Sequence, residues 1–248
     1  MQYPLLKPKY YFALFKQITA FVKAPHCVRD HEKSVKNKIY DTVGLFVLKM
    51  IFLVPVIFFF ALVYDPENVQ SQRMADRFSP LVLLLVGGFI LPFVEEIAFR
   101  LSLKFSAVNF ALTSSALLYY VLTKAIFHTK MSAVDESFFL RVSVAISFGG
   151  ILYVIFNRET LNKKVASFWA SNVRTVYYVS CIVFAWIHLS KYELIWLNVL
   201  LLPILTLPQL FSAIIYGYTR VVFGFKYPLF LHMTTNSVAI GLSMVATS

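Results

Sequence analysis

Residues 95–100 read Glu-Glu-Ile-Ala-Phe-Arg, and they follow the uncharged run from Pro80 to Val94. The apolar pattern resumes after Arg100, so one membrane helix over about Pro80 to Ser106 would hold both glutamates inside the hydrocarbon. A charged side chain at the centre of a membrane helix costs roughly 2.5–3.5 kcal/mol on insertion scales. Residues of this kind usually face a cavity and serve a function. The glutamate pair is therefore the first candidate for a functional site.

The composition places the chain among membrane proteins. Its 248 residues are 59% hydrophobic and only 14% charged, with a mean hydropathy of +0.71. A soluble domain carries nearer a quarter charged residues. Uncharged runs near the length that crosses a bilayer recur along the chain. We predict an all-α, polytopic membrane protein with a polar cavity inside the membrane.

The basic residues indicate topology and lipid contact, because most of them flank apolar segments. With a cytoplasmic N-terminus, 16 Lys and Arg fall in inside segments and 6 in outside segments. The net charge of +11 therefore does not predict a nucleic-acid partner. Cys27 and Cys181 have neither disulfide-framework nor zinc-site spacing. No cleavable signal peptide is expected, since residues 1–23 lack an uncharged core.

The chain divides into two parts. Residues 1–40 form a basic, aromatic segment, either a short helix at the cytoplasmic membrane surface or an unstructured tail. Residues 41–248 form a single transmembrane domain, with a polar loop over 157–174 and glycines at 87 and 88 that let a neighbouring helix approach. We expect about seven spans, over residues 42–64, 80–106, 107–127, 138–156, 175–189, 194–218 (kinked at Pro203 and Pro208) and 227–246.

Strongly polar groups recur inside three of these spans. Glu95 and Glu96 lie in the second, His188 in the fifth, and His232 and Asn236 in the seventh. At 1.5 Å rise per residue their depths in the membrane differ by about one or two helical turns. Three helices could therefore bring these groups to one cavity.

The spacing within each motif has a physical reason. Residues four apart share a helix face, so Glu96 can pair with Arg100 while Glu95 stays without a partner on its own helix. An acid and an imidazole beside one water can remove its proton, and His232 with Asn236 can hold the oxyanion formed on a carbonyl. These groups suffice for hydrolysis of a peptide bond without a serine or cysteine nucleophile.

The three motifs Glu95-Glu96-x-x-x-Arg100, Phe184-x-x-x-His188 and His232-x-x-x-Asn236 resemble, in this order, the signature of a known family. It is the CAAX-protease and bacteriocin-processing family of intramembrane endopeptidases, which includes the Ras-converting prenyl-protein protease. The resemblance covers about residues 80–246 and includes the approach Ile215 to Arg220.

The resemblance implies roles for individual residues. Glu95 and His188 would activate water, and His232 and Asn236 would stabilise the oxyanion. Glu96, Arg100 and Phe184 would support the site. The interval of 92 residues between Glu96 and His188 exceeds the family's usual spacing, which makes residues 107–156 an inserted helical pair.

Alternatives remain open at this point. Glu95, His188 and His232 could bind zinc with one position free for water, although we expect no cofactor. The buried histidines could instead be interhelical hydrogen-bonders in a non-catalytic immunity or scaffold protein, or part of a proton relay. For a protease, we expect a membrane-tethered protein or peptide substrate and a bacterial plasma membrane.

Overall fold

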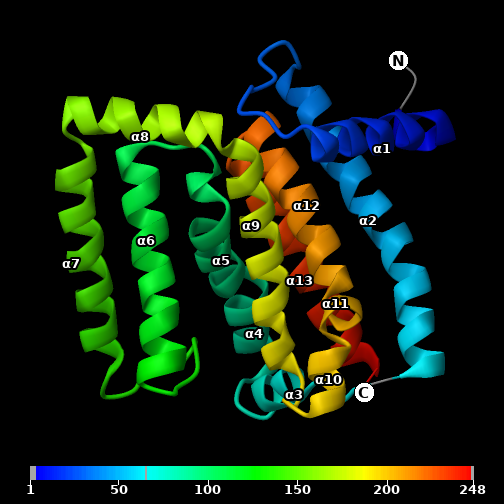
Figure 1. The fold of residues 1–248 in the computed structure, drawn as a ribbon. Helices are drawn as coiled ribbons and strands as arrows, with labels where there is room; N and C mark the ends of the chain where they lie inside the picture. Colours follow the sequence, from blue (N-terminus) through cyan, green and yellow to red (C-terminus); the bar gives the residue numbers. More distant parts are fainter. Residues whose placement is uncertain (1–3, 65, 247–248) are drawn as a thin grey trace.

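The computed structural model describes residues 4–64 and 66–246, and every regular element in that part is helical. The long helices stand side by side as a bundle (Figure 1). Four of them are long and apolar enough to cross a membrane: α2 (Val35–Val63), the segment Pro80–Leu103, α7 (Phe138–Phe156) and the segment Val173–Lys191. The other predicted spans fall on helices outside this set.

The N-terminal segment contains the short turn η1 (Pro4–Leu6) and the helix α1 (Pro8–Lys23), which lies across one end of the bundle (Figure 1). Leu14, Ile18 and Phe21 are buried in the common core, whereas Phe12 and Phe15 are exposed. Helix α2 begins earlier than predicted. Its N-cap is Ser34, whose hydroxyl accepts the backbone N–H of Asn37 at 3.2 Å.

The glutamate pair lies on an irregular helix. After α3 (Val69–Ala75), the chain forms α4 (Pro80–Leu83), the π-helical turns η2 (Leu84–Ile90), α5 (Leu91–Phe99) and the short turn η3 (Leu101–Leu103). Pro92 has no N–H for the carbonyl of Gly88, and the wider turns of η2 directly precede it. A Cβ at Gly88 would stand 2.8 Å from Ser237 Oγ. The predicted close approach of a neighbouring helix is confirmed, and that helix is α13 (Lys226–Ala246).

The region predicted as an inserted pair forms α6 (Ala107–Val121), the π-helical turn η4 (Leu122–Ile126) and α7, which stand together at one side of the bundle (Figure 1). The predicted polar loop over 157–174 is wrong, because α8 (Glu159–Ser171) fills most of it. Trp169 of α8 packs on Phe105 and Phe110, each at 5.7 Å between ring centroids. This apolar face holds the helix across the bundle end while Lys163 and Lys164 stay exposed.

The last third of the chain forms α9 (Val173–Ile187), the turn η5 (His188–Lys191), α10 (Trp196–Leu200), α11 (Leu202–Leu205), α12 (Leu207–Val222) and α13. The segment predicted as one span over 194–218 is not a continuous helix, and the number of crossings stays a prediction. Pro203 and Pro208 each stand at the second position of a new helix, where proline's missing N–H has no cost. These prolines break the segment instead of only kinking it.

The core lies where α9 and α12 meet. A Cβ at Gly217 of α12 would stand 2.6 Å from the Tyr177 ring of α9, so this ring packs directly against the backbone of α12. Phe184, Tyr216 and Leu231 are buried beside this contact. Since these residues adjoin the three polar motifs, the packing of the core fixes the positions of the motifs relative to one another.

Candidate functional site

Glu96 occupies the centre of the polar cluster. Its side chain on α5 is 0% exposed, and its Oε1 lies 3.4 Å from Arg100 Nη1. The same oxygen accepts a hydrogen bond of 2.8 Å from Nδ1 of His232 on α13. The Glu96–Arg100 pair predicted from the four-residue spacing is confirmed. Its role is wider than predicted, because Glu96 also orients the imidazole.

Glu95 lies on the other side of the same imidazole. Nε2 of His232 stands 3.5 Å from Glu95 Oε2, and the Glu95 side chain is 16% exposed. His232 therefore lies between two carboxylates. With Nδ1–H donated to Glu96, the second nitrogen either carries a proton toward Glu95 or accepts one from it. The arrangement can hold and transfer one proton.

His188 is oriented by its own helix. At the end of α9, its Nδ1 donates to the carbonyl of Phe184 at 2.6 Å, and the two rings pack at 4.6 Å. A neutral imidazole with a proton on Nδ1 has a free lone pair on Nε2, which is the form that can accept a proton from water. Phe184 also packs on His232 at 5.8 Å. The structure thus brings both imidazoles against one phenyl ring.

Asn236 serves a contact that the sequence did not indicate. Its Nδ2 donates to the carbonyl of Gly87 at 3.2 Å and so ties α13 to η2. The amide still has a second hydrogen available.

Arg100 and the carboxylates leave hydrogen-bonding capacity unused. The Arg100 guanidinium carbon lies 3.7 Å from the centroid of the Phe184 ring, a cation–π contact. Four of the buried atoms that have no hydrogen-bond partner among the described residues belong to this cluster: Glu95 Oε2, Glu96 Oε2, Arg100 Nη1 and Arg100 Nη2. Buried polar atoms without partners are rare and call for an explanation, such as a water or a ligand.

The sequence did not indicate several residues of the cluster as site residues. Among them are Tyr120 and Lys191, which both interact with Glu95, and also Tyr216 and Lys49. The Tyr216 ring of α12 stacks on His232 at 4.9 Å and 28°, and the amine of Lys49 on α2 lies 2.8 Å from the Tyr216 hydroxyl. Lys49 had a signal, because it is the one charged residue between Thr42 and Tyr64. Tyr216 had none of its own, since tyrosines occur throughout the chain.

The zinc alternative stays a prediction. Within the part of the chain that is described, no group of three or more His, Cys, Asp or Glu side chains is arranged to hold a metal ion. We derive no step through a metal.

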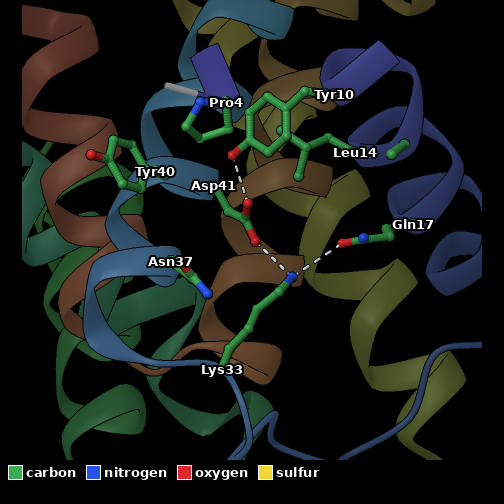
Figure 2. Close-up of a pocket in the computed structure, with 9 residues that line it drawn as sticks. Pro4, Tyr10, Leu14, Gln17, Lys33, Asn37, Tyr40 and Asp41 are labelled. Atoms are coloured by element: carbon green, nitrogen blue, oxygen red, sulfur yellow. Dashed lines mark hydrogen bonds and ion pairs between the residues drawn. The ribbon is translucent and has the colours of Figure 1, made fainter. Parts of the chain in front are cut away.

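A pocket lies away from this cluster, between α1 and α2. It has a volume of about 250 Å³ and is lined by Tyr10, Lys33, Asn37 and Asp41, among others (Figure 2). Asp41 accepts from the Tyr10 hydroxyl at 2.6 Å and pairs with Lys33 at 2.6 Å. The polar cavity predicted around Glu95 remains a prediction.

No protein-family model matches this chain, and neither a curated protein nor a solved structure matches it. The resemblance to the CAAX-protease and bacteriocin-processing family therefore stays a prediction from the three motifs. The function must be argued from the geometry of the cluster.

Proposed function

We propose that this protein is an intramembrane endopeptidase that hydrolyses a peptide bond of a membrane-tethered protein or peptide. The observation that carries the proposal is the placement of His232 between the carboxylates of Glu95 and Glu96. Glu96 orients the imidazole and Arg100 balances the Glu96 charge. Glu95 interacts with Tyr120, but its Oε2 has no hydrogen-bond partner among the described residues, so Glu95 is the carboxylate that we expect to react. The unpartnered atoms beside it are where a water or a peptide would bind.

The proposed reaction needs one water and no covalent intermediate. Glu95 accepts a proton from the water, assisted by Nε2 of His188, and the water oxygen attacks the peptide carbonyl carbon. The remaining amide hydrogen of Asn236 stabilises the oxyanion. His232 receives the proton of the water from Glu95 at Nε2 and passes it to the leaving amine as the carbon–nitrogen bond breaks, so that Glu95 is ionised again. In this scheme His232 acts mainly as a proton carrier, because both its nitrogens face carboxylates.

The proposal places the protein in a membrane. Four apolar helices support this location. The basic segments α1 and α8 lie at the same end of the bundle (Figure 1), as a cytoplasmic N-terminus with basic inside segments would require. We propose about seven crossings in total and a bacterial plasma membrane.

Replacement of Glu95 tests the proposal. Membranes of cells that carry wild-type protein, Glu95→Gln or Glu159→Gln are compared for the peptides that accumulate. Glu159 is a matched control, because it is an 81% exposed carboxylate on α8. We expect Glu95→Gln to lower cleavage at least about 100-fold and Glu159→Gln to leave it unchanged. Undiminished cleavage by folded Glu95→Gln would refute the endopeptidase.

A second candidate is a non-catalytic immunity or scaffold protein. It is favoured by the way the polar groups join helices: His232 links α13 to α5, and Asn236 links α13 to η2. Under this candidate, Glu95→Gln would keep expression and the phenotype, whereas His232→Ala would lose partner binding. Under the endopeptidase proposal, Glu95→Gln keeps binding and loses the phenotype.

A further inference from the structure

Lys49 is a buried cation that the proposed reaction does not use. Its side chain on α2 is 1% exposed. The amine donates to the hydroxyls of Tyr216 and Thr235, each at 2.8 Å. No carboxylate among the described residues forms a salt bridge with it. A charged side chain inside a membrane helix is energetically costly, so a lysine at such a position generally marks a functional region.

Each hydrogen bond around Lys49 has a defined donor and acceptor. The Thr235 hydroxyl donates to the carbonyl of Leu231 at 2.7 Å, so its oxygen is left to accept from Lys49 and, at 3.1 Å, from Tyr216. Lys49 thereby fixes the Tyr216 hydroxyl from α2 while α13 fixes it from the other side. The Tyr216 hydroxyl cannot move away without breaking these contacts.

The ring fixed in this way is the one that stacks on His232, with 4.9 Å between centroids. Because His232 is also bonded to Glu96, its imidazole is held along one edge and one face. Lys49 is thus connected to His232 through a single side chain, although the two residues do not touch.

Lys49 also lies among the charged groups of the cluster. It interacts electrostatically with Lys191 and Arg100, which carry charge of the same sign, and with Glu96, which carries the opposite charge. Lys191 in turn interacts with Glu95. The contacts that fix the Lys49 amine are therefore its two hydrogen bonds and not an ion pair.

We propose that Lys49 is a positioning residue that holds the His232 imidazole through Tyr216. The inference rests on the proposed function for its effect on turnover, but its structural part stands without it. A direct readout is therefore the nuclear magnetic resonance signal of the His232 side chain in detergent-solubilised protein labelled with ¹⁵N-histidine.

The test compares Lys49→Met, Lys49→Arg, Tyr216→Phe and the control Lys38→Met. Lys38 is a second buried lysine of α2, and it donates to the carbonyl of Asp30 far from the cluster. We expect Lys49→Met and Tyr216→Phe to shift the His232 resonances, Lys49→Arg to restore them in part, and Lys38→Met to leave them in place. Unchanged His232 resonances in folded Lys49→Met would overturn the inference. If that variant does not fold, Tyr216→Phe decides in the same way.

Turnover of a membrane-tethered reporter peptide gives the second readout. We expect Lys49→Met to lower kcat at least about tenfold with KM changed less than twofold, because the proposed reaction assigns no substrate contact to Lys49. Equal loss in Lys49→Met and Lys38→Met would indicate a merely structural role and overturn the inference. An inactive wild type would count against the endopeptidase alone, since the His232 resonances still test the position of Lys49.

Discussion

Asp41 and Glu96 are both buried carboxylates that accept from one neutral donor and pair with one base, yet their surroundings differ. Asp41 lies beside the pocket between α1 and α2, and its partner Lys33 has a side chain 25% exposed (Figure 2). Glu96 lies inside the bundle, and its partner Arg100 is only 1% exposed. Lys33 can thus remain hydrated, whereas Arg100 cannot.

The difference separates a structural joint from a candidate site. At the joint, burial and the hydrogen bond to Asp41 raise the pKa of Tyr10 well above its usual value, so Tyr10 remains a donor at any ordinary pH. Its bond to Asp41 connects α1 to α2. Asp41 Oδ2 at the joint has no further hydrogen-bond partner, but it lies 2.6 Å from the Lys33 amine. In the interior cluster, Glu95 Oε2, Glu96 Oε2 and Arg100 Nη2 also have no hydrogen-bond partner among the described residues. The interior cluster therefore has more unused hydrogen-bonding capacity for a water or a substrate.

The largest effect on stability is expected from Glu96→Ala. Removing one partner of a buried ion pair leaves the other charge uncompensated, and such a change costs about 3–5 kcal/mol. Thermal unfolding in detergent measures the loss. Glu95→Gln is the matched comparison, and we expect it to cost far less, because Glu95 is partly exposed and its Oε2 has no hydrogen bond. Equal losses would mean that the two glutamates share one structural role.

A smaller effect is expected from Asp41→Asn. The amide keeps the shape of the side chain but removes the charge that faces Lys33, and the exposed part of Lys33 regains water. We expect a loss of about 1–3 kcal/mol, in the range of a buried hydrogen bond left unsatisfied. Hydrogen exchange of the α1 backbone should speed up while that of α5 stays unchanged. Faster exchange in α5 would show that the joint and the interior cluster are coupled.

The smallest effect is expected from Glu159→Gln. Its pair with Lys163 joins two residues four apart on α8, with side chains 81% and 75% exposed. Surface pairs of this kind contribute at most about 0.5 kcal/mol. The melting temperature should therefore stay within about a degree of the wild-type value. A larger fall would mean that α8 depends on this pair more than on the packing of Trp169.

Much of the helical architecture was predictable because its causes are local. The runs that became α2 and α7 are apolar over the length of a span, and the Glu96–Arg100 pair follows from a four-residue spacing. Helix α8 was missed because its exposed lysines make a polar segment, and the aromatic contacts that hold it come from α6 and the residues before it. The division of the segment 194–218 was missed because a proline permits either a kink or a new start.

The sequence by itself determined the helical class, the close helix contact at Gly88 and the identity of the polar groups in the apolar segments. Only the tertiary structure decided which groups meet. It placed His232 between Glu95 and Glu96, turned Nδ1 of His188 toward a carbonyl, and brought Lys49 to the Tyr216 hydroxyl. The physical reason is the separation of the contacting residues along the sequence. Helix periodicity relates residues three or four apart, whereas a contact between α2, α12 and α13 depends on how whole helices pack.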